Sequence, residues 1–359
     1  MNKKPILSVA FVSLILLGIF VVLILNSHDY DPTAFVLSGS RFSQAEPQGT
    51  TGYDGQFAYY IALDPSTAYR YMDEPGKRYQ RILLPILAWM FSWGGNPMAA
   101  PWALLGINIT VVILTVTLLA VMLQEQQSNP WLALTYIFYI GTLFCIRADL
   151  NEPLAVALSL SGWFLYHRRN LTGAVVLFAL AGLAKEIGLI FPLAIACWEL
   201  LHNQKRRALI IFSFSLLPYL ILFGWLQSRW GVSTGSLMPN WLPFSGIAVL
   251  QDRAFLIVVA TWFLCPIVML LIFLFKDILS SPKVHWNLES FLVLINIAFL
   301  SILPIETWQD PLAIFRSAIP LVLAAMIWMA KNHRKLLLYL TAFWASSCIL
   351  LFITPGMVF

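Results

Sequence analysis

The chain has 359 residues, of which 60% are hydrophobic and only 11% are charged. A soluble domain carries roughly 25% charged residues, so this composition excludes an ordinary soluble protein and predicts a single all-α, polytopic membrane domain over residues 1–359. The net charge of +5 does not indicate nucleic-acid binding, because the basic residues lie in short loops where the positive-inside rule explains them.

Eleven apolar segments predict about 11 membrane spans, each of which needs roughly 20 residues. They lie at residues 5–25, 99–123, 131–146, 154–166, 171–184, 186–201, 208–227, 254–275, 288–304, 317–330 and 336–353. Several are short, so we expect them to extend into their flanks or to kink around a cavity. The first is too long for a typical signal peptide and lacks a clear cleavage site, which favours a retained span.

Basic clusters set the predicted orientation. They lie at Lys3–Lys4, His167–Arg169, Lys205–Arg207, Lys276 with Lys283, and Lys331–Lys335. With a cytoplasmic N-terminus and eleven spans, every cluster is cytoplasmic and the C-terminus lies outside. Residues 81–93 are also apolar, but a span there would reverse the later clusters, so we expect a juxtamembrane or re-entrant helix on the outer face. The expected location is the plasma (inner) membrane.

Two long loops, residues 26–98 and 228–253, then lie on the outer face with most of the acidic residues. The first loop is rich in aromatic and turn residues, which favours an ordered functional loop. The four cysteines form no CxxC pair, and all lie in or beside apolar segments. We therefore expect small buried side chains rather than a disulfide or a metal site.

The first candidate site is the segment from Gly52 to Phe57, which follows the first span. Glycines on both sides of Tyr53 and Asp54 allow a tight backbone and a close approach by a substrate. Asp54 could face a cavity at the membrane surface, with Gln56 beside it as a substrate-binding candidate. The alternative is that Asp54 caps the helix that follows.

The second candidate site is the polar stretch Arg147–Pro153 between two apolar segments. Asp149 and Glu152 share a face if the turn is helical, so the pair could hold a divalent cation or orient an acceptor. Arg147 could instead bind phosphate. The alternative is an ordinary exposed loop in which Arg147 pairs with Asp149.

The third candidate site is the charged pair Lys185–Glu186 between two short apolar segments. Ionisable residues near membrane depth indicate a functional site by default, and the alternatives are a solvated hairpin tip or a structural ion pair. Arg81 is a further phosphate-binding candidate. It belongs to a set of basic residues at the outer interface. Contact with lipid headgroups explains this set as well as contact with a substrate does. The other members of this set are Arg70, Lys77 and Arg78.

The fourth candidate site joins Glu306 with Arg316 at the start of the next span. Arg316 is well placed for a phosphate group, because a guanidinium matches phosphate oxygens in a bidentate manner. Glu306 is a candidate for contact with an acceptor or a metal ion. The alternative is that Trp308 and Arg316 anchor the protein at the membrane interface.

The order of these features resembles the GT-C superfamily of polytopic membrane glycosyltransferases, and the layout is similar to that of protein O-mannosyltransferases. The likeness rests on a cytoplasmic N-terminus, an acid in the first external loop at Asp54, a juxtamembrane helix, and a later loop with Arg147, Asp149 and Glu152. It covers about residues 1–200 in order and spacing. The chain departs from larger members in lacking a soluble C-terminal domain, and from many members in lacking an Asp-Glu pair in the first loop.

The resemblance implies a polyprenyl-phosphate-linked sugar as donor and an inverting transfer on the outer face. It implies Asp54 as general base on the acceptor hydroxyl, with Arg147, Lys185 or Arg316 stabilising the leaving phosphate. No glycine loop typical of nucleotide binding is visible, which fits a lipid-phosphate donor. The expected partners are this donor, membrane lipids and an acceptor of unknown class.

Two hypotheses from other classes stand beside the glycosyltransferase. A transporter or flippase of a lipid-linked or anionic substrate would also suit paired charges in broken spans. Such a transporter needs polar residues along a path through both leaflets, whereas the ionisable residues here gather on one side, which favours the enzyme. The third hypothesis is a non-catalytic assembly subunit.

Overall fold

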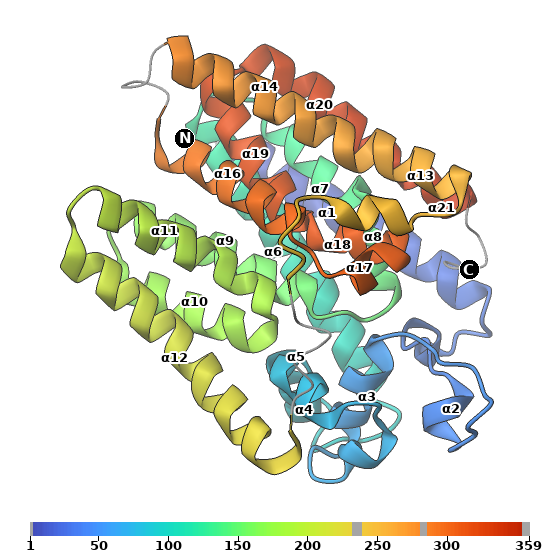
Figure 1. Ribbon diagram of the computed structural model, residues 1–359. Helices are drawn as coiled ribbons and strands as arrows, with labels where there is room; N and C mark the ends of the chain where they lie inside the picture. Colours follow the sequence, from blue (N-terminus) through green and yellow to red (C-terminus); the bar gives the residue numbers. More distant parts are fainter. Residues whose placement is uncertain (1–2, 232–238, 281–285, 354–359) are drawn as a thin grey trace.

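The computed structural model describes residues 3–231, 239–280 and 286–353, and all regular elements in these ranges are helices (Figure 1). The predicted all-α fold is therefore confirmed for the described residues. Part of the predicted loop 228–253, the basic residue Lys283 and the predicted outer C-terminus lie outside these ranges.

Five helices in the described residues are long and apolar enough to cross a membrane. They are α1 (Lys4–Asn26), α6 (Ala100–Glu125), α12 (Lys205–Trp230), the helix Arg253–Ser280 formed by α13 (Arg253–Val259), a π-helical turn and α14 (Cys265–Ser280), and the helix Arg334–Phe352 that begins with α20 (Arg334–Ser346). A sixth candidate is a bent pair, Pro130–Phe138 with Ile140–Arg147, whose halves meet at 55°. Their length and composition are those of a helical membrane protein.

The other predicted spans contain shorter helices. They are α9 (Glu152–His167), α10 (Leu171–Ala184), α11 (Ile190–Leu201), α16 (Leu288–Ser301) and α19 (Ile319–Asn332). At about 1.5 Å per residue these helices are roughly 18–24 Å long, against an apolar bilayer core of ~30 Å. A helix thus lies in each of the eleven predicted ranges, but the number of membrane crossings stays a prediction.

Helix α19 forms the centre of the core. Every side chain from Ile319 to Ala330 is buried, because α19 packs against α6, α9, α16 and α20. A helix that is apolar on all sides requires such surroundings. Helices α9 to α12 form a second group that packs together beside this core (Figure 1).

The basic loops predicted to share one face are joined by contacts. Each of the four acidic residues predicted on that face has a basic partner: Glu125 with Arg168, Glu199 with Arg207, Asp277 with His333, and Glu289 with Lys331. These pairs gather the loops around α6, α9, α11, α14 and α19 at one end of the bundle, which we call the basic end.

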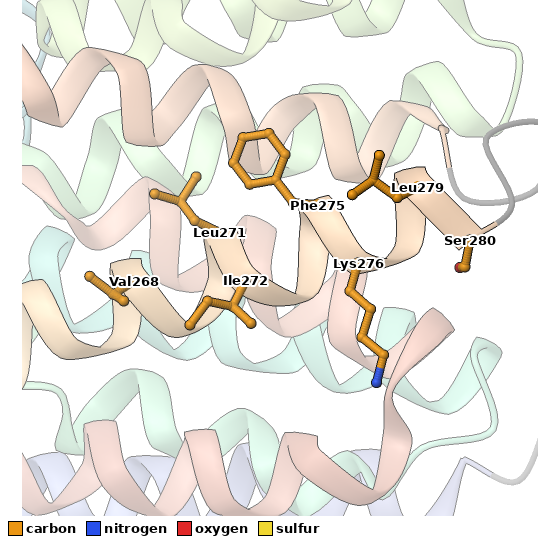
Figure 2. A pocket seen from close by; sticks show the side chains of 7 residues that line it. All are labelled: Val268, Leu271, Ile272, Phe275, Lys276, Leu279 and Ser280. Carbon is orange, nitrogen blue, oxygen red and sulfur yellow. The ribbon is translucent and has the colours of Figure 1, made fainter.

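Helix α14 presents an apolar surface that no described element covers. Val268, Ile272, Phe275 and Leu279 are exposed along its length and line a groove of about 740 Å³ (Figure 2). Lys276 lies near the end of the same face. A contiguous apolar face of this kind is unfavourable in water and suits contact with lipid chains.

The first long loop is ordered, as predicted. Residues 26–98 contain the helices η1 (Pro32–Phe35), α2 (Ser40–Ser43), α3 (Gly55–Leu63), η2 (Ala68–Tyr71), α4 (Pro75–Arg78), η3 (Tyr79–Arg81) and α5 (Leu83–Phe91). Helix α5 occupies the range of the predicted juxtamembrane helix, and its nine residues are too few to cross a membrane. It packs against α3, α6 and α10, so the loop is tied to the bundle.

Gly55 sets the position of α3. A Cβ atom at this residue would lie 1.9 Å from the carbonyl oxygen of Ala148, so only glycine lets α3 begin against the turn that follows α8 (Ile140–Arg147). Gly52 adds a backbone with a φ of 64°, which side chains disfavour. The two glycines thus fix Tyr53 and Asp54 beside the bundle.

We expect Gly55→Ala to destabilise the protein by about 1–3 kcal/mol, the usual cost of overpacking. The measurement is the thermal unfolding midpoint in detergent. Gly106→Ala in α6 is the control, because a Cβ there meets nothing within 4 Å and should be neutral or slightly stabilising. Equal shifts for the two variants would contradict the role assigned to Gly55.

Candidate functional site

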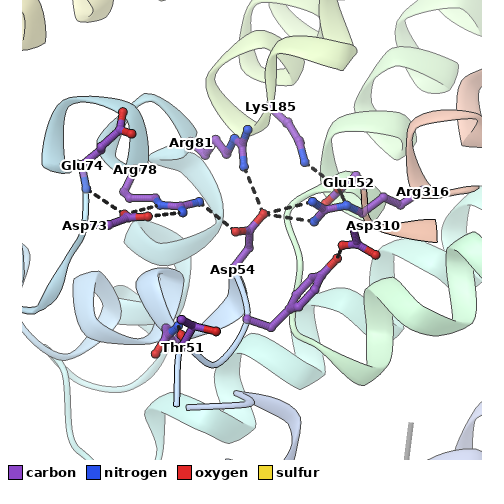
Figure 3. A network of polar contacts seen from close by, with 12 residues as sticks. Thr51, Asp54, Asp73, Glu74, Arg78, Arg81, Glu152, Lys185, Asp310 and Arg316 are labelled. Atoms are coloured by element: carbon purple, nitrogen blue, oxygen red, sulfur yellow. Dashed lines mark hydrogen bonds and ion pairs between the residues drawn. The ribbon is translucent and has the colours of Figure 1, made fainter. Parts of the chain in front are cut away.

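Asp54 and five other predicted site residues, from four distant regions of the chain, meet in one cluster, and Figure 3 shows all of them except Glu186. We call this assembly the charged cluster. Its members are Asp54, Arg78, Arg81, Glu152, Lys185, Glu186 and Arg316. They come from the start of α3, from α4 and η3, from the start of α9, from the junction after α10, and from α18 (Pro311–Ser317).

Asp54 lies at the centre of the charged cluster. Arg78 Nη1 lies 2.8 Å from Asp54 Oδ1, and both Nη atoms of Arg316 lie 3.1 Å from Oδ2. Arg81 Nη1 is 3.6 Å from the same Oδ2 atom. Asp54 precedes α3, yet its carboxylate caps no backbone N–H of that helix. The helix-cap alternative is therefore wrong.

A second carboxylate holds each of the three guanidiniums. Arg78 donates from Nε and Nη2 to Asp73 at 2.8 and 2.7 Å, Arg81 donates from Nη2 to Glu186 at 2.7 Å, and Arg316 Nε lies 3.4 Å from Glu152 Oε1. We call Asp73, Glu152 and Glu186 the outer carboxylates. Sequence reasoning placed Arg78 only in the interfacial basic set and missed Asp73, although both lie in the same acid-rich loop.

Lys185 forms a buried ion pair with Glu152, with 2.5 Å between Nζ and Oε1. It is only 6% exposed, so the solvated-tip alternative is wrong, and its partner is Glu152 rather than the adjacent Glu186. Removing one member of a buried ion pair typically costs about 3–5 kcal/mol, because the other charge stays buried. The pair therefore ties the start of α9 to the end of α10.

The cations dominate the electrostatics around Asp54. Burial by itself raises the pKa of the Asp54 carboxyl, but Arg316, Arg78, Arg81 and Lys185 outweigh it and hold this pKa well below its usual range. The Asp54 carboxylate is thus ionised at neutral pH.

A hydrogen bond joins the first loop to the segment before α18. The Tyr53 hydroxyl donates to Asp310, and the Arg316 guanidinium lies 5.2 Å from the Tyr53 ring centre. Such a cation–π contact helps to orient a guanidinium. Trp308 is fully buried, so the interfacial-anchor alternative for Trp308 and Arg316 is wrong. Sequence reasoning missed the role of Tyr53, although it adjoins Asp54.

The charged cluster forms one part of the wall of a cavity of about 430 Å³. Another part of the wall is apolar and comes from Ile187, Phe299, Ile302, Leu303 and Ala313. The exposed Glu306 also lines this cavity, so it stays a candidate for contact with an acceptor. A cavity with charged and apolar walls suits an amphipathic ligand with an anionic group.

Two predicted binding residues have structural contacts instead. Gln56 accepts a hydrogen bond from Gly39 N at 3.1 Å and donates to Thr51 O at 2.8 Å, so it braces the first loop. Arg147 donates to Ala34 O at 2.5 Å and does not line the cavity. It is buried, so the exposed-loop alternative is wrong as well.

Asp149 and Glu152 do not act as a pair. Asp149 is fully buried with a φ of 46°, and its Oδ1 accepts a 3.5 Å hydrogen bond from Asn108 in α6. Glu152 instead contacts Lys185 and Arg316. The predicted cation site between these acids is therefore not formed, and the described residues contain no group of three or more His, Cys, Asp or Glu side chains that could hold a metal ion.

Asp149 is best described as a neutral acid paired with an amide. Its Oδ2 and the Asn108 Oδ1 are both buried and have no partner among the described residues. Burial raises the pKa of Asp149 to about 8. The protonated acid satisfies both atoms if it donates to the amide oxygen of Asn108.

This assignment predicts a pH-dependent stability. In the unfolded chain Asp149 has a pKa of about 3.9, so the folded protein retains a proton that the unfolded chain loses. Stability should therefore fall as the pH rises from about 4 to about 8, a range bounded by these two values. Asp149→Asn has the shape of the neutral acid and should remove this slope, whereas the control Glu152→Gln should destabilise at every pH. Thermal unfolding from pH 5 to 8 measures both, and equal slopes in the wild type and Asp149→Asn would refute the neutral pair.

Comparisons of the chain with protein-family models, with curated proteins and with solved structures give no match. What the protein does must therefore be inferred from the charged cluster and from the cavity that this cluster lines.

Proposed function

We propose that this chain is a glycosyltransferase that moves a sugar from a polyprenyl-phosphate donor to an acceptor hydroxyl at the outer face of the plasma membrane. The observation that carries the proposal is the position of Asp54. Its carboxylate faces a 430 Å³ cavity among three guanidiniums, and the same cavity has an apolar wall. This combination supplies a base, cations for a leaving phosphate and a surface for a lipid.

The proposed step is a single inverting displacement. The acceptor oxygen attacks the anomeric carbon of the sugar and forms the new C–O bond, while the bond from that carbon to the phosphate oxygen breaks. The electron pair leaves with the polyprenyl phosphate, and the acceptor proton passes to Asp54. Fixed cations stabilise the charge that develops on the leaving oxygen, and Arg316, Arg81 and Arg78 are the groups in position.

The apolar wall supports a lipid-linked donor. Phe299, Ile302 and Leu303 lie where the isoprenoid units next to the phosphate would need contact with protein. A soluble sugar phosphate would gain little from such a wall, since apolar burial contributes about 25 cal/mol per Å² only to apolar ligands.

A transporter is less well supported. A second cavity, of about 240 Å³, lies at the basic end, and the ionisable residues that line it contact one another: Glu125 with Arg168, and Glu289 with Lys331 and His167. None of these residues lines the cavity around Asp54, whereas a transport path needs polar residues through both leaflets.

We further propose a GT-C-like layout in which all eleven helical regions cross the membrane, with α5 on the outer surface and the N-terminus inside. Reporter fusions at Gln204 and at the C-terminal Phe359 should then report opposite sides of the membrane. A matched fusion at Asn170, in another basic loop, should agree with Gln204. The same side for Gln204 and Phe359 would overturn the eleven-span layout.

We expect Asp54→Asn to lower sugar transfer by about 10²–10⁴-fold, the usual contribution of proton transfer by a positioned base. The substitution keeps the shape of the side chain and removes its charge. The measurement is turnover by purified protein with a panel of polyprenyl-phosphate sugars. Asp64→Asn is the matched control, because Asp64 lies at the other end of α3 and is exposed.

Near-normal transfer by Asp54→Asn would exclude Asp54 as the base. If the wild type transfers no sugar but moves a lipid-linked substrate across liposomes, the transporter hypothesis replaces the enzyme.

A further inference from the structure

Asp54 is a weak base as long as the guanidiniums hold its carboxylate. A general base works best when its pKa lies near the operating pH, whereas Arg316, Arg78 and Arg81 keep the pKa of Asp54 far below that range. The Lys185 ammonium acts in the same direction. The carboxylate must therefore leave these cations before it can take up a proton efficiently.

The guanidiniums can keep their positions when Asp54 leaves. Each has an outer carboxylate on its other side: Asp73 for Arg78, Glu186 for Arg81 and Glu152 for Arg316. Lys185 also holds Glu152 in place. The three cations are thus oriented by groups that do not depend on Asp54, which is the property of a preorganised site.

Charge and geometry at the point where Asp54 lies admit a phosphodiester in place of the carboxylate and favour a phosphomonoester over it. Asp54 and the outer carboxylates balance the four cations Arg78, Arg81, Lys185 and Arg316, so displacement of Asp54 leaves one positive charge unmatched. Asp54 offers two oxygens to three guanidiniums, and Arg316 and Arg81 share Oδ2 at 3.1 and 3.6 Å. The donor phosphate, a diester between the sugar and the lipid, offers two free oxygens and one negative charge, which matches the charge that Asp54 leaves. The polyprenyl phosphate that transfer releases is a monoester, which offers three free oxygens and a charge of about −1.5 to −2.

We propose that the three guanidiniums form a binding site for a phosphate ester, that Asp54 occupies this site in the unliganded protein, and that the phosphate displaces Asp54 into the cavity. The inference rests on the proposed function for the identity of the phosphate, which is that of the donor before transfer and that of the released polyprenyl phosphate after it. Binding of the donor then activates the base, because the phosphate charge offsets the cations that held the carboxylate. The four cations Arg78, Arg81, Arg316 and Lys185 face Asp54 in this exchange, and the Tyr53 hydroxyl and the Asp73 carboxylate also lie close enough to interact with its charge.

The displacement predicts that loss of the carboxylate strengthens phosphate binding. Calorimetric titration of purified protein in detergent, with inorganic phosphate and with farnesyl phosphate, measures this effect, and farnesol controls for the apolar tail. We expect Asp54→Asn to bind the phosphates about tenfold more tightly than the wild type, within the usual range of coupling between two competing groups. Asp54→Ser provides a second neutral variant if Asp54→Asn does not remain monodisperse.

Asp73→Asn is the matched control. It removes the same charge from the other partner of Arg78, but Asp73 does not line the cavity. We expect little change or weaker binding, since Arg78 loses its anchor. Arg316→Ala should weaken binding of both phosphates by about tenfold or more, because a charge-assisted contact is lost.

Tighter binding of both phosphates by Asp54→Asn supports a site for the phosphate group itself. Tighter binding of farnesyl phosphate alone supports a site for a lipid phosphate. If neither neutral variant binds phosphate more tightly than the wild type, the proposed displacement of Asp54 is overturned. The same conclusion follows if Asp73→Asn increases the affinity as much as Asp54→Asn does. The titrations need no sugar transfer, so they are independent of the turnover assay. If sugar transfer is observed but neither neutral variant binds phosphate more tightly, only the proposed displacement of Asp54 is wrong. If the neutral variants bind phosphate more tightly but no sugar is transferred, only the glycosyltransferase proposal is wrong.

Discussion

One carboxylate shared by three guanidiniums is the interaction around which the site is organised. Arg78, Arg81 and Arg316 come from two regions of the chain more than 200 residues apart, and Asp54 is the group that they have in common. Like charges that share one anion repel one another, and Asp54 and the outer carboxylates offset this repulsion where the first loop meets α18. The hydrogen bond from Tyr53 to Asp310 adds to this contact.

The two ends of the bundle differ in how their charged side chains are paired. At the basic end most acids have one basic partner, as for Glu125 with Arg168 and Asp277 with His333, whereas Glu289 contacts Lys331 at 2.9 Å and His167 at 3.8 Å. Around Asp54 the partners are shared, so an incoming anion can replace one of them while the others remain. A cluster with shared partners costs more to assemble than separate pairs, because several buried charges must be placed together. That cost is expected where a ligand is to be bound.

The sequence predicted those site residues that stand out by their polarity alone. Ionisable residues between apolar segments pointed to Asp54, Lys185 and Arg316, and all three meet. The sequence did not predict which residues pair, because pairing depends on the local backbone conformation. Asp149 lies three residues from Glu152, but its φ of 46° turns its side chain towards Asn108 in α6. The contact from Tyr53 to Asp310 joins residues 257 positions apart, and no local pattern encodes it.

The helices were predictable, whereas their environment was not. A helix that is apolar on all sides, such as α19, has the same composition whether lipid or protein surrounds it, so hydropathy cannot separate a span from a core helix. The burial of α19 matters for the site, because α18 packs directly against α19 and against α8. A Cβ on Gly141 in α8 would lie 2.5 Å from the Phe315 carbonyl oxygen, so this contact is close. Arg316 thus sits on a segment fixed by the core, and the two glycines of the first loop fix the backbone of Asp54 beside it. Displacement by phosphate therefore requires only that the Asp54 side chain rotate away, since the outer carboxylates hold the guanidiniums in place.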